Sequence, residues 1–381
     1  MLGGLGVCLG VGYSQVNNPH SALYNSVVVP TLSRMDPERC HRLAVQAARF
    51  GFVPRSPPDD PILRSTLWGR LFVNPVGLAA GFDKDAEAIS GMKKVGFGFI
   101  EIGSVCPEAQ GGNPRPRVFR LLEDRAVINR YGFNSAGSEV VEKRLNNWLS
   151  KPESRSCVLG INLGKNKSTV DPAEDYVKGV IKLGKYADYL VINVSSPNTP
   201  NLRDLQQSSH LTNIITSVQK EIHSLEMINN KQKPPLLIKI APDVSERDLK
   251  DIAQVALACS VDGIIISNTT ISRENLQSAH KNEIGGLSGA PLFLQSTSVL
   301  KSMYELTNGQ IPLIGSGGIF SGADALEKIE SGASLVELYT SMALEGPSKV
   351  PQVKQELAAL LKEKGYKSVS EAVGKNTSLG K

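Results

Sequence analysis

Eight short apolar segments recur between residues 77 and 341, and this repetition restricts the fold more than any other feature of the chain. Each is apolar for almost its whole length, which is typical of strands buried on both faces. Helical patterns separate them, so the sequence predicts an α/β fold in which eight strands close into a (β/α)8 TIM barrel. The strand candidates are GLAAG (77–81), GFIEIGSV (98–105), LGINLG (159–164), YLVINVS (189–195), LLIKIAP (236–242), GIIISNT (263–269), PLIGSGG (312–318) and LVELYTS (335–341).

An open, doubly wound parallel sheet is the alternative fold for this alternation. It would usually carry a GxGxxG turn after its first strand, and no such turn follows residues 77–81. We therefore expect a barrel domain over residues 61–381, somewhat longer than the roughly 250 residues typical of the fold. Its helices are expected at residues 85–95, 172–183, 211–225, 246–258, 322–330 and 353–362.

Two further segments lie outside the barrel repeat. Residues 113–121 and 125–134 predict a β-hairpin inserted after the second strand, where long loops usually build the active site. Residues 20–60 predict a small pair of amphipathic helices and a proline-rich linker, with Asp36 as N-cap and Pro37 at the first position of the second helix. This pair is either a cap packed on the barrel or an entrance for an apolar ligand at a membrane surface.

Residues 1–19 begin with an apolar run of about a dozen residues. A membrane-spanning helix needs roughly 20, and no basic segment precedes the run to make it a secretory signal. Three interpretations stay open: the remnant of a membrane anchor, the end of a truncated chain, or a disordered start.

Charge and cysteine content exclude several classes of function. The 42 basic and 37 acidic residues give a net charge of +5 that is spread along the chain, so we expect no nucleic-acid partner. Five scattered cysteines without a CxxC spacing argue against a disulfide framework, a zinc site or an iron–sulfur cluster, and we expect no metal.

Polar side chains gather where the predicted strands end, the face on which barrel enzymes place their sites. One asparagine after a strand is usually a turn residue. Several asparagines and two lysines, Lys84 and Lys239, at one end of a barrel instead suit a flat, amide-rich ligand such as a flavin or a pyrimidine. The asparagines are Asn129, Asn162, Asn193, Asn198 and Asn268.

A phosphate site is predicted beside them. The segment GSGGI (315–319) precedes a helix, and Tyr339 and Thr340 follow the eighth strand, the usual place of a barrel phosphate pocket. The glycines of GGLSG (285–289) are expected to add a loop, although tight turns alone would also explain these glycines. Lys239 in a buried strand needs an anion, which a reduced flavin would supply.

Ten motifs in order along the chain resemble the dihydroorotate dehydrogenase family, and its membrane-associated, quinone-dependent branch in particular. They are FDKD, GFGFIEIGSV, GNPRPRVFRL, INRYGFNS, GINLGKNK, NVSSPNTP, IKIAPD, NTT, GGLSG and GSGG. The resemblance implies FMN as cofactor, oxidation of (S)-dihydroorotate to orotate in pyrimidine synthesis, and electron transfer to ubiquinone. It further implies peripheral or anchored association with the mitochondrial inner membrane through the N-terminal helices, which would form the quinone entrance.

Site residues follow from the resemblance by position. Ser196 matches the catalytic base, which removes the C5 proton while hydride passes from C6 to flavin N5, and a serine here indicates the quinone branch. The matching cofactor contacts are Ala79, Ala80, Gly81, Lys84, Ser104, Asn162, Asn193, Lys239, Ser267, Ser288, Gly289, Gly317, Gly318, Tyr339 and Thr340. The matching substrate contacts are Lys84, Asn129, Phe133, Asn193, Asn198, Asn268 and Thr269. The matching quinone-tunnel positions are His41, Ala44, Arg120 and Tyr339.

Two other functions fit part of the pattern. A related FMN barrel would use a soluble acceptor such as fumarate or NAD, against which Ser196 and the helical pair both argue. A non-enzymatic barrel would bind a phosphate ligand as a sensor or scaffold.

Overall fold

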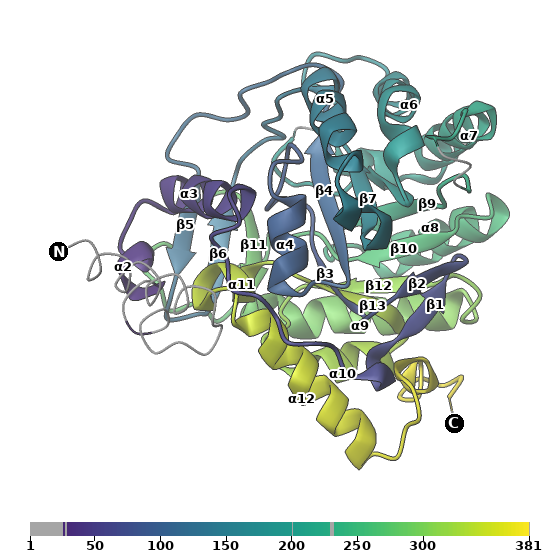
Figure 1. Cartoon of the computed structure of the whole chain (residues 1–381). Coiled ribbons are helices and arrows are strands. Elements are labelled where there is room, and N and C mark those ends of the chain that lie inside the picture. Colours follow the sequence, from purple (N-terminus) through teal and green to yellow (C-terminus); the bar gives the residue numbers. More distant parts are fainter. Residues whose placement is uncertain (1–25, 27–28, 200, 229–231, 381) are drawn as a thin grey trace.

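A closed barrel of eight parallel strands forms the centre of the computed structural model, which describes residues 26, 29–199, 201–228 and 232–380 (Figure 1). The barrel confirms the predicted fold, and the open-sheet alternative is wrong. The expectations for residues 1–19 lie outside the described residues. Around the barrel the strands are β3 (Val76–Leu78), β4 (Phe99–Val105), β7 (Val158–Leu163), β8 (Tyr189–Asn193), β9 (Leu236–Ile240), β10 (Gly263–Ile266), β12 (Leu313–Ser316) and β13 (Ala333–Leu338), and β13 pairs with β3.

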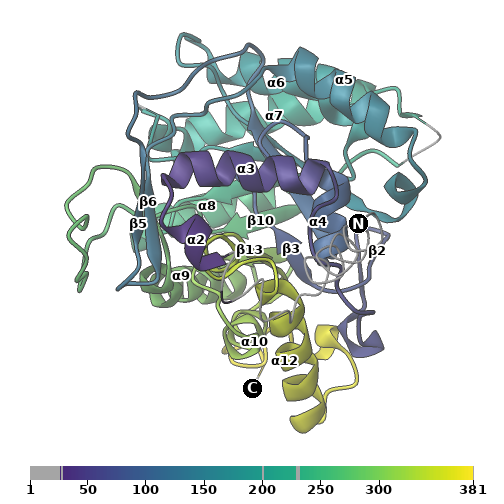
Figure 2. The ribbon, with the colours of Figure 1, turned by 60° about the vertical axis from the view of Figure 1, so that its left-hand side comes forward.

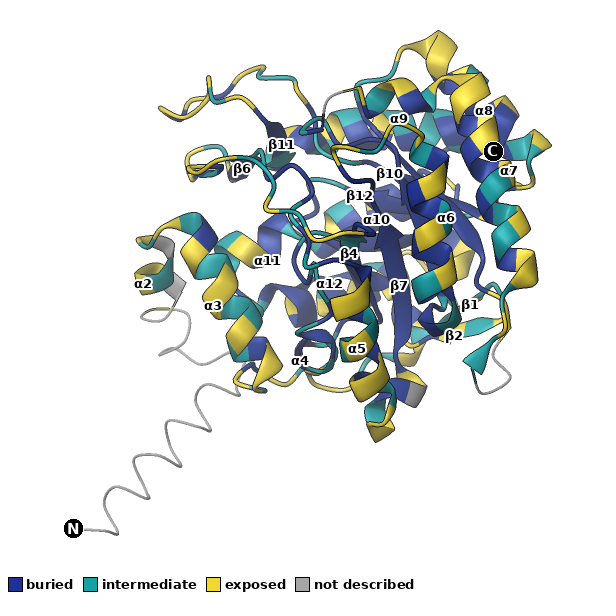
Figure 3. Ribbon diagram, turned by 90° about the horizontal axis from the view of Figure 1, so that it is seen from above, coloured by how far each residue is buried: buried dark blue, intermediate teal, exposed yellow. Residues whose placement is uncertain are grey.

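Helices cover the outside of the barrel and turn their apolar faces inward, so exposed residues lie along their outer faces while the strands are buried (Figure 3). The six predicted helices are present, but α4 begins four residues late because the Asp83 carboxylate accepts the N–H groups of Glu87 and Ala88 before it. Helices α5, α9 and α11 were not predicted. The set is α4 (Ile89–Val95), α5 (Ser138–Leu149), α6 (Pro172–Leu183), α7 (Ser208–Ser224), α8 (Glu246–Ala258), α9 (Phe293–Leu306), α10 (Gly322–Glu330), α11 (Thr340–Glu345) and α12 (Lys349–Glu363).

Aromatic side chains fill the amino end of the barrel. Phe72, Phe99 and Tyr189 are fully buried there with apolar residues from the other strands. Gly160 leaves the space that the Tyr189 ring occupies, because a Cβ on this glycine would lie 2.0 Å from that ring. A short hairpin of β1 (Ser65–Leu67) and β2 (Arg70–Phe72) carries Phe72 into this layer. The barrel is therefore solid at this end, and room for a ligand exists only at the other.

The predicted insert forms a hairpin, β5 (Val118–Leu121) and β6 (Ala126–Asn129), beside the carboxyl end of the barrel. A third strand, β11 (Gly286–Gly289), pairs with β6, so the segment GGLSG is largely a strand and not the expected glycine loop. Gly286 is required there because a Cβ would lie 1.9 Å from Thr269 Oγ1. Pairing with β11 gives β6 a partner on both edges and fixes the sheet against the barrel.

Two N-terminal helices lie against this sheet and the barrel mouth: α2 (Val29–Ser33) and α3 (Pro37–Arg49) (Figure 2). Asp36 caps α3 as predicted, accepting the N–H of Arg39 at 2.8 Å. The predicted helical pair begins at residue 20, and most of the residues between there and α2 lie outside the described residues. None of the described helices is both long and apolar enough to cross a bilayer. Short 3₁₀ turns occur at Pro61–Leu63, Pro152–Ser156, Gly184–Tyr186, Arg203–Gln206, Ala290–Leu292 and Val369–Ala372.

Candidate active site

A cavity that is partly open to solvent lies at the carboxyl end of the barrel, with the β5–β6–β11 sheet as one wall. Most of the residues expected to bind cofactor or substrate line it. They are Ala79, Ala80, Gly81, Lys84, Ser104, Asn129, Phe133, Asn193, Ser196, Asn198, Lys239, Ser267, Asn268, Thr269, Ser288, Gly289, Gly317, Gly318, Tyr339 and Thr340. Asn162 lies one layer below, where its Oδ1 accepts from Ser104 Oγ and from Asn193 Nδ2.

The floor of the cavity carries a buried cluster of charges. Lys239 Nζ lies 3.4 Å from Glu101 Oε1 and 3.3 Å from Glu337 Oε2, and both carboxylates are fully buried. Burial alone would lower the pKa of Lys239, but the carboxylates of Glu337 and Glu101 outweigh it and raise that pKa. The anion that the sequence required for Lys239 is therefore supplied by the barrel itself, a correction to the expectation that a flavin would supply it.

Two carboxylates and one ammonium leave this cluster with one negative charge too many. Burial, and then repulsion from Glu101, raise the pKa of Glu337 to about 8. Glu337 lines the cavity, and its Oε1 is buried without a hydrogen-bond partner among the described residues. A protonated Glu337 would offer this oxygen to a ligand group above it.

Asparagine amides converge from the ends of β6 and β8 and from the loops that follow β8 and β10. Asn193 Nδ2 donates to Ser104 Oγ at 2.9 Å, while its Oδ1 accepts from Asn268 Nδ2 at 3.1 Å. Across the cavity, Asn198 Nδ2 donates to Asn129 Oδ1 at 3.3 Å. These mutual bonds fix which end of each amide donates, so the site presents a set pattern of donors and acceptors to a flat ligand.

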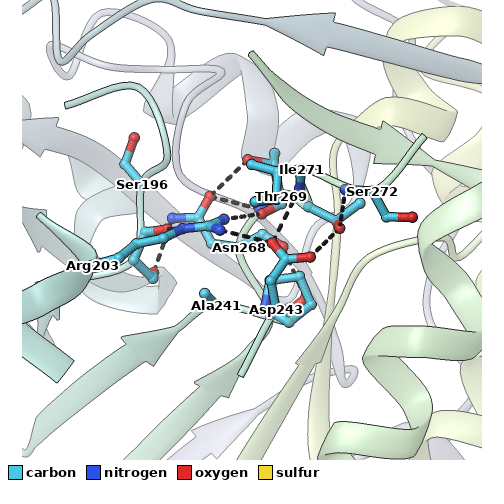
Figure 4. A network of polar contacts seen from close by, with 12 residues as sticks. Ser196, Arg203, Ala241, Asp243, Asn268, Thr269, Ile271 and Ser272 are labelled. Carbon is cyan, nitrogen blue, oxygen red and sulfur yellow. Dashed lines mark hydrogen bonds and ion pairs between the residues drawn. The ribbon is translucent and has the colours of Figure 1, made fainter. Parts of the chain in front are cut away.

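Ser196 lies on the loop after β8, at the edge of the polar network drawn in Figure 4. The residue is 8% exposed, and its Oγ accepts the backbone N–H of Asn198 at 3.3 Å. No described histidine or carboxylate is hydrogen-bonded to this hydroxyl, so an acyl-transfer triad is not present here.

An arginine fixes the loop that carries Ser196. Arg203 Nε donates to Ser195 O at 3.1 Å, and its two other nitrogens donate at 2.8 Å to Asp243 Oδ2 and Thr269 O (Figure 4). Asp243 in turn accepts from the Ile271 N–H at 3.1 Å and from Thr270 Oγ1. One guanidinium therefore joins the loops that follow β8, β9 and β10, and holds Ser196 in place relative to Thr269.

A glycine turn forms the other end of the cavity, after β12. Gly317 and Gly318 line the cavity and have φ of +101° and +80°, which side-chain-bearing residues rarely adopt, and turns of this kind can present backbone N–H groups to an anion. Beside it, Thr340 Oγ1 donates to Ser288 Oγ at 2.9 Å, and Ser341 Oγ is buried without a partner among the described residues. These are the groups that a phosphate requires.

The expected tunnel residues are His41 and Ala44 on α3, Arg120 on β5 and Tyr339 after β13. The His41 ring packs against Tyr339, with ring centroids 6.3 Å apart. Its Nδ1 is hydrogen-bonded to Tyr131 Oη at 3.1 Å and its Nε2 to Phe82 O at 2.8 Å. Burial lowers the pKa of His41 to about 4, so the ring is neutral at physiological pH. Ala44 packs on the barrel core, and Arg120 Nη1 donates to Met35 O at 2.7 Å. Neither residue lines the main cavity.

Comparison with known proteins agrees with this geometry. The sequence profile described as dihydroorotate dehydrogenase matches residues 62–361. The chain belongs to the dihydroorotate dehydrogenase family. It is 53% identical over 371 residues to the rice (Oryza sativa subsp. japonica) mitochondrial dihydroorotate dehydrogenase (quinone), covering 91% of this chain and 79% of that protein. The corresponding mouse (Mus musculus) protein is 51% identical over 380 residues, covering 98% and 95%. A crystal structure of DHODH from Eimeria tenella in complex with ferulenol superposes with a TM-score of 0.87 at 48% identity, covering 90% and 96%.

Four side chains of this dihydroorotate dehydrogenase site were missed by the sequence analysis: Glu101, Glu337, Arg203 and Asp243. The two glutamates could have been found from the sequence. Each is the single charged residue of an otherwise apolar strand, and a buried charge requires a partner. Arg203 and Asp243 stand 40 residues apart in loops, and no local pattern indicates that they pair.

Proposed function

We propose that this protein oxidises (S)-dihydroorotate to orotate with FMN and passes the electrons to ubiquinone, as a step of pyrimidine synthesis. The observation that carries the proposal is the single cavity in which the amide cluster, the glycine turn and Ser196 meet. Its relatives in rice and mouse bear the name of the quinone-linked, mitochondrial enzyme. No described group of His, Cys, Asp or Glu side chains could hold a metal ion, and the proposal requires none.

The residues present fit FMN. The glycine turn and the partnerless Ser341 Oγ suit its phosphate, and the fixed amides with the partnerless Glu337 Oε1 suit its ring. Bound FMN supplies an acceptor for the hydride from substrate C6. Its contacts are proposed to be Ala79, Ala80, Gly81, Lys84, Ser104, Asn162, Asn193, Lys239, Ser267, Ser288, Gly289, Gly317, Gly318, Tyr339 and Thr340.

Substrate orientation falls to the amides and to Lys84. Dihydroorotate is an anion, and of the two lysines lining the cavity Lys84 has no carboxylate partner among the described residues, whereas Lys239 has two. Lys84 therefore binds the substrate carboxylate, with Phe133 beside it. Asn129, Asn193, Asn198, Asn268 and Thr269 then hydrogen-bond the ring and hold its C5–C6 edge for reaction.

Ser196 acts as the base that removes the C5 proton. A serine hydroxyl is a weak base, so Ser196 must give up its own proton as its Oγ takes the C5 proton, and the Asn198 N–H that this Oγ accepts holds the hydroxyl in position. The proton must then pass from the serine to another hydroxyl or to water. Thr199 Oγ1, three residues further along the loop, is buried without a partner among the described residues and is available to accept it.

Ubiquinone is proposed to enter between α2 and α3 and to reach the cavity beside Tyr339. His41, Ala44, Arg120 and Tyr339 would line this tunnel, because α3 brings the first two to the wall of the cavity. The N-terminal segment would bind the surface of the mitochondrial inner membrane, from which an apolar quinone can diffuse into the tunnel.

Orotate formation by the purified protein tests this function. We expect orotate when a short-chain ubiquinone is the acceptor, and none above background with fumarate or NAD. Orotate with fumarate or NAD but not with ubiquinone would contradict the quinone tunnel. No orotate with any acceptor, in protein that retains FMN, would contradict the proposed substrate.

A further inference from the structure

Lys328 on α10 is a fully buried lysine for which the proposed reaction gives no role. Three of the other buried lysines are neutralised by carboxylates: Lys239 by Glu337 at 3.3 Å, Lys349 by Glu345 at 2.6 Å and Lys354 by Asp59 at 2.5 Å. Lys328 has no such ion pair among the described residues, and its Nζ donates to Ser296 Oγ at 2.5 Å. A buried ammonium without a counter-ion is costly, so a missing anion must be identified.

The ammonium lies directly behind the glycine turn that follows β12. Ser296 Oγ, which it contacts, lies 3.3 Å from Gly317 O. Phe293, whose ring is 5.0 Å from Nζ, packs against Gly318 so closely that a Cβ on this glycine would lie 2.5 Å from it. The lysine stem reaches this place across Gly315, where a Cβ would lie 3.2 Å from Lys328 Cδ. The charge and the cavity are therefore on opposite sides of one backbone turn.

We infer that Lys328 is a positioning residue for the FMN phosphate. Its ammonium, held by Ser296, lies behind the Gly317–Gly318 turn, and its positive charge stabilises the phosphate bound on the cavity side of that turn. The inference rests on the proposed function, because it requires a phosphate ligand at this turn. Charges separated only by packed protein interact more strongly than charges in water, so an ammonium in the layer behind the turn still favours a dianion.

Binding of FMN and protonation of Lys328 are then coupled. Burial lowers the pKa of Lys328 to about 7. A phosphate dianion near it favours the charged form and raises that pKa, so FMN binding takes up a proton in the range above pH 7. The affinity for FMN must fall as the pH rises through this range, because more of the free protein then carries a neutral Lys328.

The surroundings of Lys328 leave few other groups that could cause such a pH dependence. Among the described residues, Glu327 and Asp324, both on α10, act on its charge, and both favour protonation. Charged groups on the elements packed against α10 have other partners: Glu337 of β13 pairs with Lys239, Glu356 of α12 accepts from Gly322 N, Lys354 of α12 pairs with Asp59, and Glu305 of α9 accepts from Ser378 N.

Equilibrium release of flavin from the holoprotein tests the inference. Dissociation constants for FMN and, after exchange, for riboflavin are measured by flavin fluorescence at pH 7.0 and pH 9.0. Riboflavin has the same ring but lacks the phosphate. The ratio of the two dissociation constants therefore cancels any effect of pH on binding of the ring. For the wild type we expect the preference for FMN to fall about tenfold or more from pH 7.0 to 9.0.

Lys328→Met removes the charge and keeps the length of the stem. We expect this variant to bind FMN about tenfold more weakly at pH 7.0, to bind riboflavin as before, and to show the same FMN-to-riboflavin ratio at both pH values. Lys301→Met on α9, a partly exposed lysine with the same change of charge, should behave as the wild type.

Two results would overturn the inference: an unchanged FMN-to-riboflavin ratio in Lys328→Met, or a wild-type ratio that does not vary between pH 7.0 and 9.0. The second does not depend on the variant and applies even if the variant does not fold. A wild type that binds riboflavin and FMN equally, or neither, would instead contradict the proposed FMN site itself.

Discussion

Serine is an unusual residue for the base proposed here, and the surroundings of Ser196 fix its position. The hydroxyl is almost buried and accepts a backbone N–H, and Arg203 fixes the loop on which it lies. The chemistry proposed here requires proton removal while hydride leaves, so placement beside the acceptor matters more than the basicity of the free hydroxyl.

Replacing Ser196 by alanine removes the proposed base and leaves the proposed cofactor contacts in place. We expect flavin reduction by dihydroorotate to slow by about 10²- to 10⁴-fold while FMN stays bound. Stopped-flow absorbance under anaerobic conditions measures the rate. Ser209→Ala, at an exposed serine of α7, is the control and should retain the activity. A wild-type rate in Ser196→Ala would remove this residue from the mechanism.

Lys84 gives a prediction on pH. Burial lowers its pKa to about 8, so the free protein carries the charge below pH 8 and loses it above. If Lys84 binds the substrate carboxylate, kcat/KM for dihydroorotate falls by up to about tenfold per pH unit above 8, while kcat changes less because the bound anion holds the proton. Lys84→Met should have a raised KM and should lose this fall; an unchanged fall in the variant would assign it to another group.

At the scale of elements, α3 is fixed to the insert by one buried ion pair. Glu38 accepts from Arg117 Nε at 3.0 Å and from its Nη2 at 2.8 Å, and Arg115 Nη2 lies 2.8 Å from the same carboxylate. Burial opposes the charge of Glu38, but the two arginines outweigh it and lower the pKa of this carboxyl. The pair holds α3, and with it His41, against the wall of the cavity.

Glu38→Ala leaves the Arg117 guanidinium, 6% exposed, without its carboxylate, and this costs about 3 kcal/mol of local stability. We expect faster hydrogen exchange across α3 and slower reoxidation of the flavin by ubiquinone, with unchanged reduction by dihydroorotate. Glu139→Ala, which breaks the exposed pair with Lys143, is the control and should alter neither. Loss of both half-reactions in Glu38→Ala would show that α3 supports the whole barrel mouth.

The elements also show what the sequence can predict. All eight barrel strands were predicted because burial on both faces leaves a continuous apolar run, and their closure places every strand end at one face. That is why residues far apart in the sequence could be assigned to one cavity. Helix α9 has serines and threonines that favour turns, and β11 is half glycine, so neither shows its periodicity locally. Their structures depend on neighbours elsewhere in the chain, as does the pairing of Lys239 with its two glutamates.

At the scale of the whole molecule, the proposed function places two reactions in one cavity. Substrate groups enter beside the β5–β6–β11 sheet, and the proposed quinone path reaches the cavity from α3 past His41 and Tyr339. The barrel floor is closed by aromatic side chains, so both partners must meet the cofactor from the carboxyl end. The proposed reduction and reoxidation of the flavin would then both take place in this cavity.

The most direct test of this claim is the anaerobic flavin absorbance of the purified protein, recorded after addition of dihydroorotate and again after addition of a short-chain ubiquinone. We predict that dihydroorotate bleaches the flavin band and that ubiquinone restores it. A band that dihydroorotate does not bleach would contradict the substrate site. A bleached band that ubiquinone leaves unchanged, but fumarate or NAD restores, would contradict the role given to α2 and α3.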